Sequence, residues 1–422
     1  MGLSSADFDF TRRDSRPPGG EVDNFCLFII VGVKMKKIVL AILCIALFRP
    51  AFSFFPFFHG ARSLALGYAS LAFNYDVNAI YLNPALLNSF GAPMGGYQFA
   101  SSYLDYADFA GKLQRITAAD LKNFSALSPA EKSDLWDRLR DVFADGNGIS
   151  GFQAKNPGYA GKGYGFAVEF IDAAVVFPQA SAILDKPVAA VSDADIASLR
   201  MRFSGFHYTD YSAAVAVPLG RGVSLGAALH YLKGEASEFD VAVVDEPFRP
   251  ASGAGEYLRH AWSGAEKGFS KVNFDLGLSA ELGAYFKAGL TVKNAADPVI
   301  VSEKRELRLP RRVIAGLTFR PDGQFGISLD IDAAANDLYH TGRKVQPLSL
   351  GMEKGFFQNK FFLRAGFLND LSQKYFFGRQ AKIIYGLGLG FNLAKFLVDV
   401  AIGLDGLGHV KNLGVSGFYL IK

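Results

Sequence analysis

Cysteine is nearly absent from this sequence of 422 residues. The only two are Cys26 and Cys44. Both lie near the amino terminus, in a part that the pattern described below predicts to be removed. The remaining chain would then have no disulfides, thiolate metal ligands or cysteine nucleophiles. This is typical of an envelope protein that folds without oxidation.

Long apolar runs and an excess of one charge are also missing. Half of the residues are hydrophobic, yet beyond the leader no run reaches the roughly 18 apolar residues that a membrane helix needs. The net charge is only +4, and no basic run stands out, so nothing indicates nucleic-acid binding. Glycine (45) and phenylalanine (39), in contrast, are abundant. This composition suits the wall of a β-barrel.

The amino-terminal segment has the pattern of a secretory leader. Met35, Lys36 and Lys37 precede an apolar stretch over 38–48, and Ala51-Phe52-Ser53 supplies small residues for cleavage. We therefore expect a signal peptide at 35–53 and an upstream extension at 1–34, with translation starting at Met35. The alternative is an unusually long leader.

Alternating hydrophobicity is the strongest signal in the rest of the chain. In 270–282, Val272, Phe274 and Leu276 alternate with Asn273 and Asp275, and the same period recurs in 323–333, 383–392 and 395–405. In a membrane barrel, such segments of roughly ten residues place alternate side chains toward lipid and toward the lumen. The pattern predicts transmembrane β-strands.

Strand number and loop parity favour an all-β fold, an antiparallel transmembrane β-barrel of about fourteen strands over residues 94–422. Short connections alternate with long ones, as in barrels with periplasmic turns and longer extracellular loops. A soluble periplasmic β-sandwich is the alternative, but it favours shorter strands with Greek-key returns. The predicted strands are 94–103, 149–156, 163–177, 198–218, 223–237, 270–282, 284–295, 310–320, 323–334, 344–356, 360–371, 379–392, 395–405 and 411–421; the predicted short turns include 156–162.

Two long extracellular loops are expected to contain helical inserts, at about 104–148 and 238–269. In the first, Ser128-Pro129-Ala130-Glu131 is a capping box with proline at the first helical position, and the helix should run to about Ala144. The second contains His260 and Trp262.

The stretch from Gly60 to Leu87 fits neither a strand nor a regular helix. It contains Asn83-Pro84-Ala85, where proline removes a backbone donor and biases Asn83 toward an extended conformation. We interpret residues 54–93 as a plug, or hatch, inside the barrel, with Asn83, Pro84 and Ala85 as its central motif. The alternative is an ordinary segment packed on a sheet edge.

This stretch resembles the FadL-like outer-membrane transport superfamily, including its PorV/PorQ-type and TraF-type relatives. The resemblance is carried by the leader, the Gly-Ala-Arg-Ser at 60–63 and the Asn-Ala-Ile-Tyr-Leu-Asn-Pro-Ala-Leu at 78–86. It implies a plugged outer-membrane barrel, surrounded by lipid, that passes hydrophobic small molecules. PorV-type relatives imply the alternative, a non-transporting barrel that docks or shuttles envelope or secretion proteins.

Charged residues on the predicted lumen face are the remaining candidates for chemistry. We expect these carboxylates to hydrate the lumen or to pair with inward basic residues such as Arg312 and Arg320. Paired carboxylates could also serve an outer-membrane hydrolase, but no activated nucleophile accompanies them. The candidate lumen-facing polar residues are Asp275, Asp330, Asp332, Arg364 and Asp399.

No cofactor or metal is predicted, and the protein is not expected to be an enzyme. None of the six histidines has a partner at metal-ligand spacing. Gly386, Gly388 and Gly390 superficially resemble a dinucleotide loop, but they alternate with large apolar residues and precede no helix. They are better interpreted as small lumen-facing residues that let the plug approach the wall.

Overall fold

The computed structural model describes residues 60–106, 109–116, 121–144, 148–179, 181–244, 266–301, 306–338, 343–372, 383–404 and 410–421. The predicted leader (1–53) and the start of the predicted plug lie outside these residues. So do His260, Trp262 and most of the second predicted insert. No helix in the described ranges is long and apolar enough to cross a bilayer.

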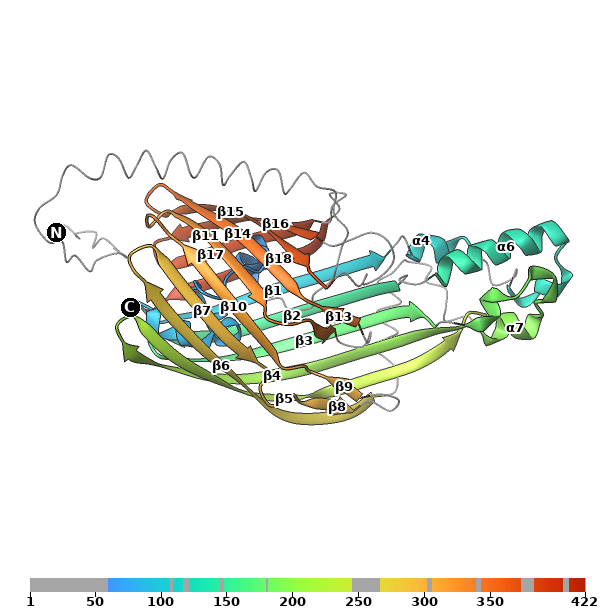
Figure 1. The fold of residues 1–422 in the computed structure, drawn as a ribbon, viewed down its shortest axis with the longest axis horizontal. Coiled ribbons are helices and arrows are strands. Elements are labelled where there is room, and N and C mark those ends of the chain that lie inside the picture. Colours follow the sequence, from blue (N-terminus) through green and yellow to red (C-terminus); the bar gives the residue numbers. More distant parts are fainter. Residues whose placement is uncertain are drawn as a thin grey trace, which may run out of the picture. The chain divides into compact units, whose positions relative to one another are not determined.

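Fourteen antiparallel strands form a closed barrel, which confirms the predicted fold. Each strand pairs with its neighbours in the chain, and β1 closes the ring by pairing with β18, for example Met94 with Leu420 (Figure 1). The barrel strands are β1 (Met94–Tyr106), β2 (Gly148–Gly161), β3 (Tyr164–Pro178), β4 (Arg200–Gly220), β5 (Val223–Ala242), β6 (Glu266–Leu282), β7 (Phe286–Lys293), β10 (Arg312–Phe319), β11 (Phe325–Asp332), β14 (Pro347–Phe356), β15 (Phe361–Asp370), β16 (Ile383–Leu393), β17 (Phe396–Leu404) and β18 (Val410–Leu420).

One predicted turn is wrong. The sequence predicts a short turn at 156–162, but β2 continues to Gly161. Proline is tolerated there because the ladder to β3 is interrupted between Lys155 and Gly158, so Pro157 needs no donor on that side. The chain reverses instead around Gly163, whose φ of 83° favours glycine.

Two small hairpins lie outside the barrel sheet. β8 (Val299–Val301) pairs with β9 (Glu306–Arg308) between β7 and β10. β12 (Asn336–Leu338) pairs with β13 (Arg343–Val345) between β11 and β14. Both belong to long connections, so one end of the barrel carries long loops and the other carries only short turns.

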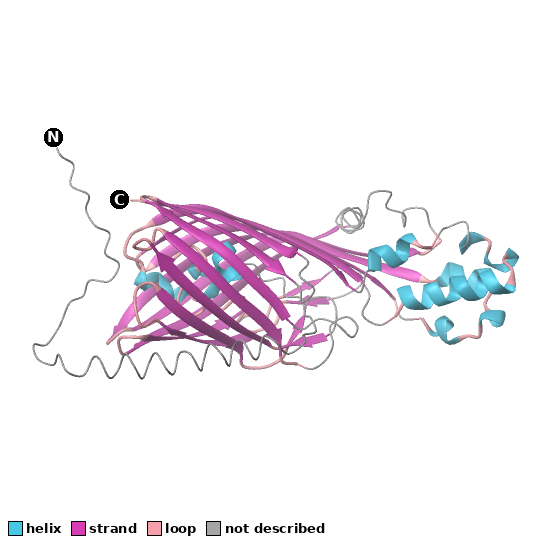
Figure 2. Cartoon of the chain, turned by 90° about the horizontal axis from the view of Figure 1, so that it is seen from above, coloured by secondary structure: helices cyan, strands magenta, loops and turns pink. Residues whose placement is uncertain are grey.

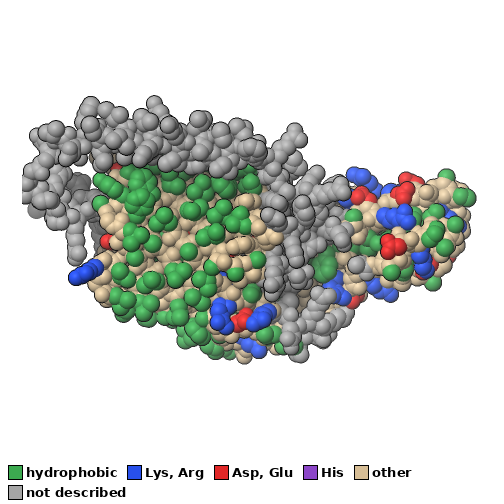
Figure 3. Space-filling model, viewed as in Figure 1, with side chains coloured by type: hydrophobic (Ala, Val, Ile, Leu, Met, Phe, Trp, Pro, Cys, Tyr) green, Lys and Arg blue, Asp and Glu red, His purple; other side chains and the backbone are tan. Residues whose placement is uncertain are grey.

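Outward side chains of the barrel are apolar, as the alternation predicts. Val272 is 59% exposed whereas the next residue, Asn273, is 3% exposed. Hydrophobic side chains cover the outer wall in Figure 3. Aromatic pairs such as Phe286 with Phe319 (ring centroids 4.9 Å apart) and Phe361 with Phe391 (5.4 Å) lie at the short-turn end. An apolar band with an aromatic girdle is the exterior of a transmembrane barrel.

A group of helices packs at the long-loop end. We call its described parts, within 109–144 and 181–199, the helical cap. Its helices are α4 (Phe109–Gln114), η2 (Phe124–Ala126), α6 (Pro129–Val142), η3 (Ala182–Asp185), η4 (Val188–Ala190) and α7 (Asp193–Ser198). One apolar cluster joins them to β2–β4, and β3 and β4 run on toward them in Figure 1.

The first predicted helical insert is observed, and the second is corrected at its ends. Ser128 and Glu131 form the capping box of α6, which ends at Val142. The insert expected at 238–269 begins and ends as strand, because β5 continues to Ala242 and β6 starts at Glu266. The short helices between β3 and β4 were not predicted, because they lack a long amphipathic period.

The plug lies inside the barrel. It consists of α2 (Gly60–Ala65), α3 (Ala79–Leu82) and η1 (Pro84–Ser89) with irregular connections, seen in cyan within the ring of strands in Figure 2. Its apolar side chains are buried, including Leu64, Ile80 and Leu87. The predicted plug is therefore part of the observed fold, and the sheet-edge alternative is wrong.

Candidate functional site

Asn83 fixes the carboxy-terminal half of the plug. Its backbone is extended (φ −155°, ψ 100°), as the following proline favours, and its side chain caps η1 by accepting the Ala85 N–H at 3.1 Å. Its amide nitrogen donates to the carbonyl oxygens of Leu71 (3.2 Å) and Leu278 (3.0 Å). One buried side chain therefore joins two parts of the plug to β6.

Glycines in the wall let the plug backbone approach. A Cβ on Gly226 would clash with the backbone of Ala85, and one on Gly386 would clash with the Leu64 carbonyl. Gly388 likewise faces Ala65, as predicted for this run. Gly390 differs from the prediction, because a Cβ there would meet the Arg364 guanidinium and the Asp399 carboxylate. It makes room for an ion pair rather than for the plug.

A buried ion network holds the amino-terminal half of the plug. The Arg62 Nε donates to Glu353 Oε2 at 3.1 Å, and the Tyr75 hydroxyl lies 3.3 Å from the same oxygen. The Arg62 guanidinium also lies over the Tyr75 ring, 4.3 Å from its centroid. Glu353 is on β14, so these contacts fasten two plug residues to one wall residue.

The wall completes this network. The Arg364 guanidinium donates to Glu353 Oε2 at 2.6 Å and to Asp399 Oδ1 at 2.5 Å, and Arg320 Nη1 lies 3.4 Å from Glu353 Oε1. Three arginines, including Arg62, therefore surround two carboxylates. Removing one partner from such a buried group costs about 3–5 kcal/mol, since it leaves a charge uncompensated.

The Asp330 side chain binds backbone groups of the plug. The carboxylate oxygen Oδ2 accepts the N–H groups of Ser70 (2.7 Å) and Leu71 (2.8 Å). Gly316, the partner of Asp330 across the β10–β11 pair, leaves space for the carboxylate. Asp330 is therefore a wall residue that fastens the plug at its middle.

A second group of charges lies beside α3. The Lys293 ammonium pairs with Asp275 and donates to the carbonyl oxygen of Tyr81 at the end of α3. His230 lies between Asp275 (3.2 Å from Nε2) and Asp210 (3.0 Å from Nδ1). Lys293 thus connects the wall to the carboxy-terminal half of the plug.

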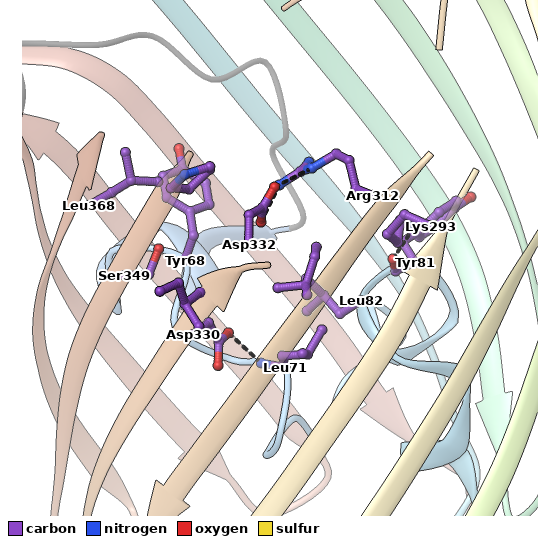
Figure 4. A pocket seen from close by; sticks show the side chains of 13 residues that line it. Tyr68, Leu71, Tyr81, Leu82, Lys293, Arg312, Asp330, Asp332, Ser349 and Leu368 are labelled. Carbon is purple, nitrogen blue, oxygen red and sulfur yellow. Dashed lines mark hydrogen bonds and ion pairs between the residues drawn. The ribbon is translucent and has the colours of Figure 1, made fainter. Parts of the chain in front are cut away.

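A pocket opens between the plug and the wall near the long-loop ends of β7, β10, β11 and β14 (Figure 4). The empty space between its lining residues, open solvent at the mouth included, is about 620 Å³. Tyr68, Leu71, Tyr81 and Leu82 are contributed by the plug, and the Arg312–Asp332 ion pair by the wall. The other lining residues are Lys293, Ile314, Asp330, Ile331, Pro347, Ser349 and Leu368.

The predicted lumen-facing residues are all buried in the barrel interior, but they do not form one group. Asp330 and Asp332 line the pocket, and Asp332 pairs with Arg312 as one of the predicted basic partners (2.7 Å). Arg364 and Asp399 pair within the ion network, and Asp275 belongs to the charges beside α3. Within the described ranges, no group of three or more His, Cys, Asp or Glu side chains is placed to hold a metal ion.

Several residues of the site were not predicted from the sequence. Glu353 occupies one of the alternating buried positions of β14, so the alternation of this strand could have identified it as lumen-facing. Arg62 is part of the Gly-Ala-Arg-Ser motif at 60–63, which does not identify its partner, and Tyr75 lies in an irregular segment with no period. His230 and Asp210 come together only because β4 and β5 pair in one register.

Solved structures show the same fold at low sequence identity. The CymD monoaromatic hydrocarbon channel is 14% identical (TM-score 0.50; 87% of this chain and 99% of that chain covered). The P. putida toluene transporter TodX is 11% identical (TM-score 0.50; 86% and 98%). A deltaS2 mutant of the TodX monoaromatic hydrocarbon channel is 12% identical (TM-score 0.52; 86% and 99%).

Sequence comparison gives the family. No curated protein matches the chain, but the family model described as "F plasmid transfer operon, TraF, protein" matches residues 80–332, from the plug helix α3 to the end of β11. This match spans more than half of the sequence and confirms the predicted resemblance to the FadL-like superfamily with its TraF-type relatives. The chain belongs to the family of the F plasmid transfer operon protein TraF.

Proposed function

We propose that this protein is an outer-membrane barrel through which hydrophobic small molecules pass without an energy source. The observation that carries this proposal is the pocket between plug and wall, whose lining is mainly apolar and aromatic. Mostly apolar pockets with a few placed polar groups are the usual form of small-molecule sites. The hydrocarbon channels named above have the same fold.

Passage requires the plug to shift, and the contacts of the pocket allow a ligand to promote this shift. Leu71 lines the pocket and is held by Asp330, and Tyr81 lines it and is held by Lys293. A ligand that displaces either side chain would strain the hydrogen bond behind it. We propose that Asn83, Pro84 and Ala85 keep the hatch closed, because Asn83 joins Leu71 to β6.

The outer membrane is the proposed location. The apolar exterior with its aromatic girdle fits a bilayer, and the predicted signal peptide would direct export.

A reversible tether between plug and wall tests the proposal. Ala61 Cβ lies 3.3 Å from the position of a Cβ on Gly414, slightly below the disulfide range of about 3.5–4.5 Å. Ala61→Cys with Gly414→Cys should form a disulfide after a small adjustment. Cells carrying the untethered protein in the outer membrane should take up N-phenylnaphthylamine faster than cells without it, and oxidation of the double variant should abolish the gain.

Reduction of the tether and the two single-cysteine variants are the controls, and both should restore uptake. Uptake that is the same with and without the protein contradicts the proposal and favours the alternative, a barrel that docks envelope or secretion proteins. Uptake that is unaffected by the closed tether shows that α2 stays in place during passage.

A further inference from the structure

We infer that Glu169 binds a proton inside the barrel, and that loss of this proton releases the plug helix α3 from the wall. The inference goes beyond the proposed function, because Glu169 is not among the residues that line the pocket. It is carried by the burial of Glu169, by a second carboxyl group opposite it, and by the balance of the charges around both.

Glu169 is a buried carboxyl group at an inward-facing position of β3. It is only 4% exposed. Among the residues that the structure describes, it makes no hydrogen bond and no ion pair. A bare carboxylate in such a place costs more free energy than a carboxyl group that carries a proton.

Asp210 stands directly opposite Glu169 in the β3–β4 ladder. Side chains at such positions share one face, with Cβ atoms about 4.5–5.5 Å apart, and two like charges there are destabilising. Asp210 has partners of its own, because it accepts a hydrogen bond from the Ser212 hydroxyl at 2.8 Å and lies 3.0 Å from His230 Nδ1. Two carboxyl groups in this arrangement are stable together when one of them carries a proton, and Glu169 is the one without a partner.

The charges around Glu169 balance without it. Asp210 and Asp275 are two negative charges; Lys293 and an imidazolium at His230, which lies between the two carboxylates, are two positive ones. An imidazole placed between two carboxylates favours its charged form. An ionised Glu169 would therefore add a third negative charge to a group that is already neutral.

The other elements packed against Glu169 supply no further cation. On β2, the ladder register brings the uncharged Asn156 opposite Glu169. From the plug, the Tyr81 hydroxyl faces Glu169 and Asp210. The cations that act on Glu169 are His230 and Lys293, and both of these already pair with Asp275.

Lys293 connects this group of charges to the plug. It donates to the carbonyl oxygen of Tyr81 in α3 and pairs with Asp275 (Figure 4). An ionised Glu169 attracts Lys293, and a lysine drawn toward Glu169 leaves the Tyr81 carbonyl. We therefore expect α3 to be held at neutral and lower pH, where Glu169 keeps its proton, and to be released as the pH rises.

Infrared spectroscopy of the full chain in detergent tests for the proton itself. At neutral pH, the carbonyl band of protonated carboxylic acids should be weaker in Glu169→Gln than in the unaltered protein, and this difference should disappear at alkaline pH. Glu281→Gln changes an exposed carboxylate on β6 and is the matched control, which should leave the band unchanged. Loss of only an ionised-carboxylate band in Glu169→Gln at neutral pH overturns the inference.

A thiol at the end of α3 tests for its release. The chain beyond the predicted leader has no cysteine, so Leu82→Cys provides one reactive group for a water-soluble maleimide. Its labelling is compared with and without Glu169→Gln at each pH, so that the pH dependence of the thiol cancels. The rates should be equal at mildly acidic pH, and at alkaline pH the protein that keeps Glu169 should label roughly tenfold faster.

A second variant tests the latch without relying on Glu169→Gln. Lys293→Gln removes the cation that holds the Tyr81 carbonyl, so labelling of Leu82→Cys should be fast at every pH. Slow labelling in this variant, or equal rates with and without Glu169→Gln at every pH, overturns the release of α3.

Neither measurement uses a transported molecule, so the inference and the proposed function fail separately. Uptake of N-phenylnaphthylamine together with an ionised Glu169 at neutral pH overturns only the inference. A proton on Glu169 that controls labelling, in a protein that gives no uptake, supports the inference and contradicts the proposed function.

Discussion

The barrel has a long wall and a short wall. The strands β1–β6 contain 13 to 21 residues, whereas β7, β10, β11 and β14–β18 contain 8 to 11. The long wall carries the helical cap at its far end. The short wall carries Glu353, Arg364 and Asp399 of the ion network that fastens the plug.

The two walls differ in how far their alternation persists. In β16 of the short wall, buried and exposed positions alternate along most of the strand. In β4 of the long wall, they alternate from Asp210 to Val217, but Phe203 to Phe206 are buried in succession. The cap covers the second face there, so both faces are shielded. Alternation therefore marks where a strand has lipid on one side, and its loss marks where packing replaces lipid.

The largest effect is expected in the short wall. Arg364→Ala leaves Glu353 and Asp399 with fewer partners in a buried site, and should destabilise the folded barrel by about 3–5 kcal/mol. Unfolding in denaturant, followed by the gel mobility of unheated samples, measures this. Arg138→Ala, which removes an exposed ion pair, is the control and should have little effect. An equally stable Arg364→Ala variant would mean that the network does not hold the short wall.

A core substitution in the cap should damage only the far end of the long wall. Trp136 is fully buried in the cap cluster beside Phe124, with ring centroids 6.3 Å apart. Trp136→Ala should cost about 3–5 kcal/mol within the cap. Limited proteolysis should then cleave 121–144 while the barrel keeps its unheated gel mobility. Loss of that mobility would show that cap and barrel fold as one unit.

Arginine on the outer face should distinguish lipid from water. Leu329 on β11 is 41% exposed within the apolar exterior, and Leu329→Arg near the midplane should cost about 2–4 kcal/mol. Thr209 lies on the same face as Tyr211, whose ring pairs with Tyr231 at 6.2 Å, and is further toward the long-loop end. Thr209→Arg should assemble almost normally. An equal loss of assembly in the two variants would mean that the lipid-covered part of the long wall extends to Thr209.

The smallest effect is expected on the stability of the helical cap at acidic pH. Hydrogen bonds from Lys186 and Ser192 lower the pKa of the Asp195 carboxyl from 3.8 to about 2. A lowered pKa stabilises the folded cap above pH 3.8, and this contribution disappears as the pH falls through about 2. Pepsin digestion between pH 4 and pH 1.5 should therefore show increasing cleavage near α7. The Asp195→Asn variant has no carboxyl group to titrate at position 195. Its cleavage near α7 should therefore lack the pH dependence that Asp195 contributes.

Strand positions were predictable because each one depends on a local pattern. The period of two in 270–282 and 323–333 reflects lipid on one side of each strand, and the capping box at Ser128 needs only its own four residues. The predicted turn at 156–162 is wrong because the strand tolerates Pro157 where its hydrogen-bond ladder to β3 is interrupted. A ladder involves two segments of the chain, so a local pattern does not reveal it. The same reason explains why Gly390 was assigned to the plug rather than to an ion pair.

The sequence by itself determined the alternation of the strands, the capping of α6, and the extended backbone of Asn83 before Pro84. These depend on residues within one turn or one strand of each other. Only the tertiary structure decided that Arg62 meets Glu353, that Asp330 holds Ser70 and Leu71, and that the cations of the pocket are paired. The contacts between plug and wall join residues about 260 to 290 positions apart, so they exist only once the ring of strands has closed around the plug.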